Sequence, residues 1–369
     1  MTTSNILSQL GSAGVSTGFK NRIINGAMVI DQRNNGASVS VSSGTSGYMA
    51  DRWFYEYAGS ATGVTVQQVT DAPTGFSNSI KITIGTGASV AAGNYLDFEQ
   101  KIEGFNTIDF AFGTSSASTI TLSFWVKSSI AGTYSICLQN AASGATRGYT
   151  TTYTISSANT WEQKTITVAG DTSGTWVGAS NACSLNLILL AGAGSSYQTS
   201  TLNSWRSGGF AIANTVTNTI ISTSGATIQW SGVQLEVGTT ATNFDYRPYG
   251  TEFDLCRRYF EIYSGGTNTE GNIPQGIAQV DAANRPEIML FYYPKRTGPT
   301  ITTSGTMSVN TMANTGYTAT YLGTYVGTYN YGSNLFFSVS TGVTPNTLSG
   351  IVELFFGSGG GSVSISAEL

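Results

Sequence analysis

Short segments in which apolar and polar residues alternate recur along most of this chain. In residues 120–127 (ITLSFWVK), four apolar side chains alternate with the others, and Trp125 falls on the outward-facing set. A period of two residues places successive side chains on opposite faces of a β-strand. Residues 64–69 and 79–84 repeat the pattern, and clusters of glycine, serine, threonine and asparagine separate such runs. About ten strands of this kind precede residue 245, a spacing typical of a β-sandwich, so we predict an all-β fold.

One segment has a helical pattern instead. Thr251 and Asp254 resemble the start of a capping box, and the apolar residues that follow recur on one helical face. We predict a short helix over Thr251–Tyr263, with a strand over its second half, residues 259–263 (YFEIY), as the alternative. A Pro-Tyr-Gly turn precedes this segment, and we place a domain boundary near Gly250.

The boundary divides the chain into three parts. We predict an arm at 1–20, a sandwich domain at 21–250, and a C-terminal domain at 251–369 that holds the short helix and a smaller β-sandwich. The arm consists mostly of small and polar residues, so we expect it to be extended, or ordered only by a partner.

The chain contains no histidine, which excludes Ser-His-Asp triads, Cys-His dyads and imidazole metal ligands. Its net charge is -4, and no run of lysine and arginine is longer than a pair. Binding to nucleic acid needs a basic surface, so we expect no nucleic-acid partner. Phosphate-loop and metalloprotease motifs are also missing. We therefore expect no enzymatic activity, no cofactor and no metal.

The three cysteines, Cys137, Cys183 and Cys256, are widely spaced and odd in number. This pattern fits neither a disulfide framework nor a zinc site, so we predict buried thiols in a chain made in a reducing cytoplasm. The first residues do not form a secretory signal. The longest apolar stretch, near 185–193, is too short to cross a bilayer, and we expect a soluble protein without membrane insertion.

Two clusters pair charges with aromatic rings. Asp51, Arg52 and Trp53 could line a ligand groove, but a strand tryptophan usually packs in the core. We therefore expect Trp53 to be buried and Arg52 to clamp a carboxylate. Arg247 can likewise hold a carboxylate, and Pro248 sets the turn beside it.

Glycosidase chemistry needs two carboxylates across a cleft. Asp97 and Glu99 share one face of a strand, and Lys101 follows on the same face. We predict a solvated or ion-paired face rather than an acid–base pair. Other carboxylates show no catalytic spacing: Glu103, Asp109, Asp171 and Asp245.

The segment of the C-terminal domain after Arg296 has few charges and several tyrosines. After Arg296 there is no lysine or arginine. The candidate glycan-binding residues are Tyr317, Tyr321, Tyr325, Tyr329 and Tyr331. Residues four apart share one face of a strand, although intervening glycines favour two strands and a turn. A tyrosine ring and its hydroxyl suit stacking on sugars, and the alternative is burial in a core or a subunit interface.

Longer motifs together resemble a known family. They are FKNRIINGAMVIDQRNNG (19–36), YMADRW (48–53), ITLSFWVKSSIAGTYSICLQN (120–140), TWEQKTITVAGDTSGTW (160–176) and IQWSGVQLEVGTTATNFDYRPYGTEFDLCRRYFEIY (228–263). The chain resembles bacteriophage tail fibre and virion proteins that contain a carbohydrate-binding-module-like jelly-roll domain, of the type found in cyanophages. The resemblance covers residues 19 to 305, and the closing motif is its most specific part.

This resemblance implies a homotrimeric virion component, placed in the tail and assembled in the host cytoplasm. It also implies that the arm docks on other phage tail or virion proteins, through Asn5, Ile6, Leu7 and Leu10. Our first hypothesis is a receptor-binding tail fibre that attaches to host cell-surface polysaccharide through several weak sites. The alternative is a purely structural virion protein, such as a head decoration or a tail adaptor. A polysaccharide depolymerase is a third reading, weakened by the missing carboxylate pair and β-helix repeat.

Overall fold

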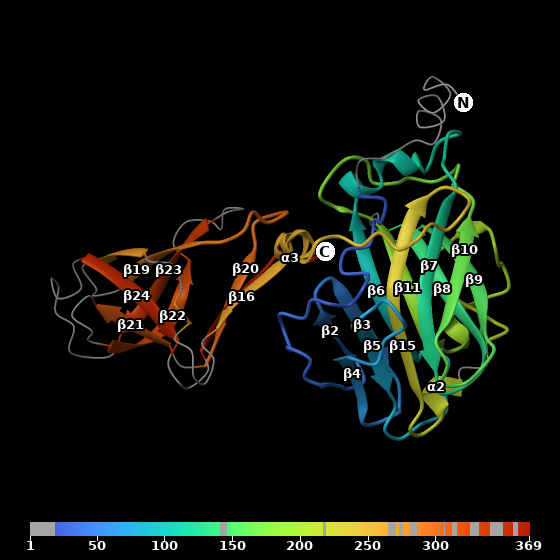
Figure 1. The fold of residues 1–369 in the computed structure, drawn as a ribbon, viewed down its shortest axis with the longest axis horizontal. Coiled ribbons are helices and arrows are strands. Elements are labelled where there is room, and N and C mark those ends of the chain that lie inside the picture. Colours follow the sequence, from blue (N-terminus) through green and yellow to red (C-terminus); the bar gives the residue numbers. More distant parts are fainter. Residues whose placement is uncertain are drawn as a thin grey trace, which may run out of the picture. The chain divides into compact units, whose positions relative to one another are not determined.

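A computed structural model describes residues 19–140, 146–216, 219–264, 271–272, 276–280, 286–305, 307–311, 316–324, 332–339, 350–356 and 361–369. The chain forms two compact units, Met1–Tyr249 and Gly250–Leu369 (Figure 1). Strands dominate both units, which confirms the all-β prediction. No helix within the described ranges is long and apolar enough to cross a membrane.

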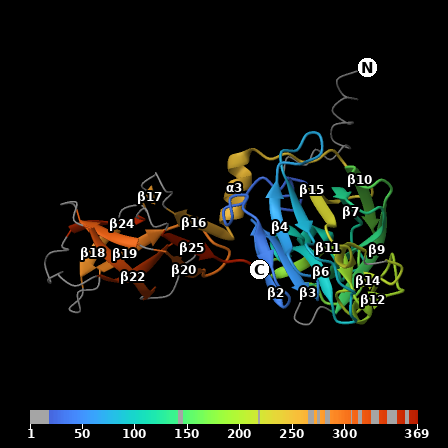
Figure 2. The ribbon, with the colours of Figure 1, turned by 90° about the horizontal axis from the view of Figure 1, so that it is seen from below.

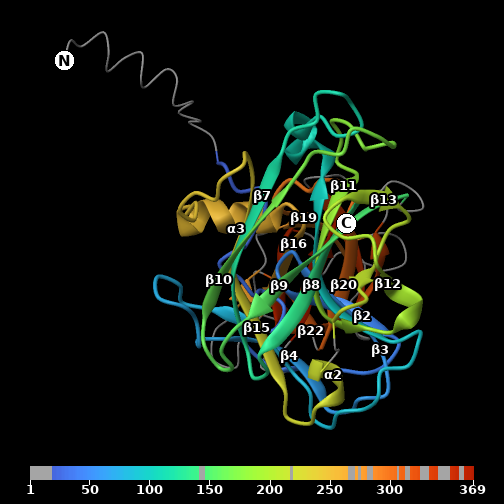
Figure 3. The same ribbon diagram turned by 90° about the vertical axis from the view of Figure 1, so that its right-hand side faces the viewer.

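The first unit is a jelly-roll sandwich of two mainly antiparallel sheets (Figure 3). The six-stranded sheet has the order β1 (Val39–Val41), β4 (Val64–Val69), β5 (Ser79–Thr83), β15 (Thr227–Val237), β7 (Ile120–Ser128) and β10 (Glu162–Val168). The seven-stranded sheet has the order β13 (Trp205–Ser207), β9 (Arg147–Ile155), β8 (Gly132–Asn140), β11 (Cys183–Ala193), β6 (Tyr95–Glu103), β3 (Trp53–Ala58) and β2 (Thr45–Ala50). Most neighbouring strands are distant in sequence, so the fold depends on long-range pairing.

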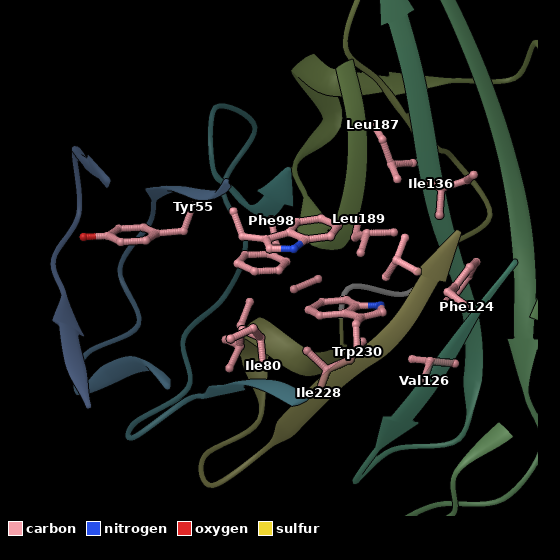
Figure 4. Close-up of a cluster of buried hydrophobic side chains, with 14 of the residues drawn as sticks. Tyr55, Ile80, Phe98, Phe124, Val126, Ile136, Leu187, Leu189, Ile228 and Trp230 are labelled. Carbon is pink, nitrogen blue, oxygen red and sulfur yellow. The ribbon is translucent and has the colours of Figure 1, made fainter. Parts of the chain in front are cut away.

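Apolar side chains from the two inner faces fill the space between the sheets (Figure 4). The rings of Trp53, Phe98 and Trp230 stack almost parallel, with centroid separations of 4.9 and 6.0 Å. Trp53 and Trp230 are fully buried. The prediction that Trp53 is a core residue is therefore confirmed.

Short elements surround the sheets: η1 (Gly104–Asn106), η2 (Ile108–Phe110), η3 (Ser195–Tyr197), α2 (Thr219–Ser222) and the parallel strands β12 (Gln198–Thr199) and β14 (Ile212–Ala213). The segment with β12 and β14 crosses the outer face of the seven-stranded sheet (Figure 2). There Ile212 and Val216 belong to a small hydrophobic cluster with Cys137, Ile188 and Leu190. This sheet therefore has apolar packing on parts of both faces.

The two arginines singled out in the sequence bind main-chain oxygens. Arg52, which is 1% exposed, donates from Nη2 to the carbonyl oxygen of Lys101 at 2.5 Å. Arg247 donates to the carbonyl oxygens of Asn21 and of Ile23, the latter at 3.0 Å. These contacts are with carbonyls, and the carboxylate partners that the sequence suggests for the two arginines stay predictions. Both arginines tie distant segments of the first unit together.

All three cysteines are free thiols. Cys137 and Cys256 are buried as predicted, whereas Cys183 is half-buried because it begins β11 at the end of the sheet. Burial raises the pKa of Cys183 to about 11.

The second unit begins with a shorter helix than the sequence predicts. Helix α3 spans Tyr249–Arg257, and strand β16 spans Phe260–Ser264. The helix prediction to Tyr263 is therefore wrong, and the alternative strand is correct for the second half. The reason is pairing: each residue of β16 has a register partner on β25 (Ser362–Ser366), which also pairs with β20 (Thr300–Ser304).

A seven-stranded sheet forms the rest of the second unit. Its order is β17 (Gly271–Asn272), β24 (Gly350–Phe356), β18 (Gly276–Val280), β19 (Pro286–Phe291), β23 (Gly332–Val339), β22 (Gly316–Thr324) and β21 (Met307–Thr311). Strand β24 pairs with both β18 and β21, so the strands from β24 to β21 form a closed ring of hydrogen-bonded neighbours.

The candidate glycan-binding tyrosines fall in this sheet or outside the described residues. Tyr317 and Tyr321 lie on strand β22. The register partner of Tyr317 is Val309 on β21, and that of Tyr321 is Phe337 on β23. Outside the described residues are Tyr325, Tyr329, Tyr331 and the arm residues Asn5, Ile6, Leu7 and Leu10. The roles of both groups stay predictions.

Candidate functional site

The seven-stranded sheet of the first unit has a row of polar side chains on the outer face of β6. Leu96 and Phe98 point into the core, so the alternate residues Asp97, Glu99 and Lys101 point to the outer face. This face also carries the crossing segment described above, which shields part of it from water.

Neighbouring strands extend this polar row. Glu56 on β3 lies opposite Asp97, and Ile188 on β11 lies opposite Glu99. One strand further, β8 contributes Gln139. These side chains line a cavity of about 230 Å³, which we call the carboxylate cleft. Its lining residues are Glu56, Tyr95, Asp97, Glu99, Lys101, Gln139, Asn186, Ile188, Tyr197 and Phe210.

Three aromatic rings form one side of the carboxylate cleft. Tyr95 comes from β6, whereas Tyr197 and Phe210 come from the crossing segment. Their centroids lie 5.2, 5.9 and 5.4 Å apart, and each pair meets edge to face. Such packing fixes the rings against one another, so the apolar side of the cleft is preformed.

Two of the three carboxylates of the cleft, Asp97 and Glu99, are buried, whereas Glu56 is half-buried. Asp97 is 3% exposed and Glu99 is 4% exposed. Burial, followed by the charges of Glu99 and Glu56, raises the pKa of Asp97 well above its ordinary value. Burial and the charge of Glu99 also raise the pKa of Glu56. Lys101 offsets part of this repulsion, since its Nζ lies 3.4 Å from Oε1 of Glu99.

Four buried oxygens in the cleft accept no hydrogen bond from the described residues. They are Oδ1 of Asp97, Oε1 of Glu99, Oε1 of Gln139 and Oδ1 of Asn186. Asn186 uses its amide nitrogen to donate to Oε2 of Glu99 at 2.6 Å, which orients its own oxygen. Oε1 of Glu99 has its ion pair with Lys101, whereas the other three acceptors have no such partner, and an unsatisfied buried polar atom costs about 1–3 kcal/mol. The cleft is therefore built to receive several hydrogen-bond donors.

The donor set is a poor match to a metal ion. Within the described ranges, no three Asp, Glu, His or Cys side chains converge in a way that could hold one. Acceptor oxygens beside aromatic rings suit instead a ligand that has several hydroxyl groups and apolar C–H faces.

The prediction for Asp97 and Glu99 is partly wrong. The ion pair of Glu99 with Lys101 is present, but the two carboxylates are buried rather than solvated. Strands β3 and β11 flank β6 on both sides, and this burial depends on pairings over long sequence separations. For the same reason, no local pattern indicated that Gln139 and Asn186 would lie beside them.

The other candidate carboxylates lie outside the carboxylate cleft. Asp171 accepts two hydrogen bonds from Arg147, at 2.6 and 2.7 Å. Asp109 pairs with Arg22 at 2.5 Å, and Asp245 accepts a hydrogen bond from the main-chain nitrogen of Lys20 at 2.8 Å. Glu103 is buried. The paired groups act as structural clamps.

No protein-family model matches the chain, and no curated protein matches it in sequence. Among solved structures, it is similar to the enzymatically active domain of tailspike protein 4 of bacteriophage CBA120, with 17% identity and a TM-score of 0.33. That match covers 59% of this chain and 21% of the tailspike chain. A protein of Bacteroides thetaiotaomicron that is described as sugar-binding matches with 10% identity and a TM-score of 0.32. That match covers 59% of this chain and 100% of the Bacteroides chain.

The family 11 carbohydrate-binding module of Clostridium thermocellum, solved in complex with a β-1,3-1,4-mixed-linked tetrasaccharide, matches with 11% identity and a TM-score of 0.28. That match covers 56% of this chain and 98% of the module. The similar structures thus include binding modules and an enzymatic domain. At these low identities and TM-scores, they carry no argument about the activity of this chain.

Proposed function

We propose that the chain is a glycan-binding protein and that the carboxylate cleft of its first unit holds the glycan. The observation that carries this proposal is the set of four buried acceptor oxygens beside three packed rings. Sugar hydroxyls would donate to these oxygens, and the apolar face of a pyranose would rest on the rings. The role is binding, and no step of catalysis is assigned to the cleft.

The charges of the cleft determine which glycans it accepts. Glu56, Asp97 and Glu99 face a single lysine, Lys101. An acidic sugar would bring a further negative charge to buried carboxylates, which costs several kcal/mol in a poorly hydrated site. We therefore expect neutral sugars or amino sugars to bind, and uronic or sialic acids to be rejected.

Replacing Gln139 by leucine should weaken glycan binding about tenfold, because one acceptor of the cleft is lost at nearly constant volume. Gln139 makes no hydrogen bond through Oε1, so the free energy of unfolding should not decrease. The measurement is a glycan array that includes neutral, amino and acidic sugars, followed by calorimetry of the full chain with the best neutral ligand.

The matched control for this variant is Thr133→Val. Thr133 lies on the same face of β8 as Gln139 but outside the carboxylate cleft, so its replacement should leave binding unchanged. If the full chain is folded and binds no glycan on the array, the glycan-binding proposal fails, and a structural role becomes the better reading.

We further propose that the chain is a homotrimeric component of a bacteriophage tail, which attaches to polysaccharide of the host surface. The motifs at 19–36 and 228–263, which resemble phage virion proteins, support this assignment. Three copies would raise the avidity of individually weak sites.

Antibodies against the chain test this assignment on phage particles. Labelling of tails in electron micrographs, together with a solution mass of three chains, is the expected result. Labelling of heads, or a monomer in solution, would contradict it.

A further inference from the structure

A second cleft lies on the outer face of the six-stranded sheet. Its volume is about 640 Å³, and the rings of Phe76, Trp125, Phe244 and Tyr246 line it, so we call it the aromatic cleft. We propose that the aromatic cleft is a second glycan-binding site, which takes a short neutral oligosaccharide. The inference goes beyond the first site, because the two clefts share no lining residue.

The floor of the aromatic cleft is built at an irregular point of the sheet. The register between β15 and β7 shifts at this place, and Gly232 of β15 has a φ of 58°. A Cβ atom at Gly232 would lie 2.6 Å from the ring of Phe76 and 3.0 Å from that of Trp125. Glycine therefore allows both rings to lie close to the backbone, with Trp125 on the outer face of β7.

The wall of the cleft is a cluster of three rings. Phe76, Phe244 and Tyr246 have centroid separations of 5.0, 5.5 and 4.8 Å. The hydroxyl of Tyr246 donates to the carbonyl oxygen of Gly75 at 2.9 Å, which anchors the ring although 59% of the residue is exposed. The rings are thus held in place before any ligand arrives, which lowers the entropic cost of binding.

The polar groups of the aromatic cleft are uncharged. Its lining includes Gln163, Thr165 and Asn243 but no Asp, Glu, Lys or Arg. Among the described residues, nothing accepts a hydrogen bond from the indole N–H of Trp125 or pairs with the side-chain amide of Gln163. These groups can therefore bind ligand hydroxyls without first breaking an internal bond.

A neutral oligosaccharide fits this combination better than other ligands do. The C–H faces of pyranose rings pack on aromatic rings, and their hydroxyl groups bind amides and other hydroxyls. A charged ligand would find no counter-charge in the lining. The volume lies in the range of ordinary ligand sites and exceeds that of the carboxylate cleft, so it can receive several sugar units.

The two clefts can be followed separately, because Trp125 lines the aromatic cleft and no tryptophan lines the carboxylate cleft. The full chain would be labelled with fluorotryptophan, and the Trp125→Phe variant would identify one of its six fluorine resonances. Short neutral oligosaccharides of glucose, mannose, xylose and galactose are the probes, titrated to millimolar concentration. A saturable shift of the Trp125 resonance with at least one probe is the expected result.

Variants then assign that shift to the site. Tyr246→Ala should weaken the response about tenfold, because an anchored ring is lost. Gln139→Leu in the carboxylate cleft should leave the response of the Trp125 resonance unchanged. Phe105→Ala should also leave it unchanged, because the exposed ring of Phe105 lines neither cleft. The proposal is overturned if no probe moves the Trp125 resonance, or if Tyr246→Ala responds like the wild type. A response that disappears in Gln139→Leu would place binding in the carboxylate cleft alone.

Discussion

Replacing Glu261 by alanine should destabilise the second unit by about 3–5 kcal/mol. The carboxylate of Glu261 accepts hydrogen bonds from Nε of Arg257 and from the main-chain nitrogen of Tyr293, both at 2.8 Å. It also lies 3.1 Å from Nζ of Lys295, a side chain with 0% exposure. Without Glu261, the buried ammonium of Lys295 loses its counter-charge, which is costly for a side chain that solvent does not reach.

The tryptophans separate the two units in this experiment. All six lie within the first unit, the last being Trp230, so tryptophan fluorescence follows the first unit while far-ultraviolet circular dichroism follows both. Glu261→Ala should lower the melting temperature in the dichroism signal and leave the fluorescence transition in place. Asp254→Asn is the control, because Asp254 is half-exposed and 3.7 Å from Arg257, and it should cost less than about 1 kcal/mol. Equal effects of the two variants would contradict this account.

The same cluster gives the second unit a characteristic pH dependence. Burial lowers the pKa of Lys295 from 10.5 to about 8. The folded state therefore binds this proton less tightly than the unfolded state, so the penalty is present below pH 8 and relieved as the pH rises toward 10.5. Burial raises the pKa of Tyr292 to about 12, and this opposing effect begins only near the ordinary tyrosine value of 10.0. Stability should thus increase between about pH 8 and about pH 10 in the wild type, and not in Lys295→Met.

Asp97→Asn should stabilise the first unit at neutral pH by about 1–2 kcal/mol, or a few degrees in melting temperature. The pKa of Asp97 is raised in the folded state, chiefly by burial and next by Glu99. A carboxyl of this kind stabilises the fold fully below its ordinary pKa of 3.8, and this stability is lost as the pH rises. Asparagine has no proton to lose, so the tryptophan-fluorescence transition should depend less on pH.

Glycan binding should respond to the same substitution. Sugar hydroxyls donate to the ionised carboxylate, so the affinity of the carboxylate cleft should increase with pH in the wild type. Asp97→Asn should remove most of this increase, and calorimetry at a series of pH values above the ordinary aspartate pKa of 3.8 measures it. Asp109→Asn is the control, because the side chain of Asp109 is 50% exposed in its pair with Arg22. A pH dependence that persists in Asp97→Asn would show that another group governs binding.

Period-two alternation predicted much of the first unit because it depends only on local residues. It placed Phe124 in the core and Trp125 on the outer face, and the burial of Trp53 followed from its size. The local pattern left residues 259–263 undecided between helix and strand, because β16 is stabilised by β25, roughly a hundred residues later in the chain. A local pattern contains no information about such a partner.

The candidate sites were harder to predict than the fold. Asp97 and Glu99 are two residues apart, so the sequence placed them on one face. Their burial and the approach of Gln139 depend on the order and register of four strands, which alternation does not specify. The aromatic cleft was missed for a similar reason, since Phe76 and Trp125 meet only across the bulge at Gly232.

The contacts that join the two ends of the first unit have a mechanical consequence. Arg247 binds the carbonyl of Ile23, Asp245 accepts hydrogen bonds from the backbone at Lys20, and the nitrogen of Arg22 donates to the carbonyl of β15 residue Leu235 at 2.8 Å. Tension applied to the chain on both sides of this unit would meet these bonds first and pass directly between its ends. The two sheets, with the clefts on their outer faces, would then keep their structure under tension until these hydrogen bonds break.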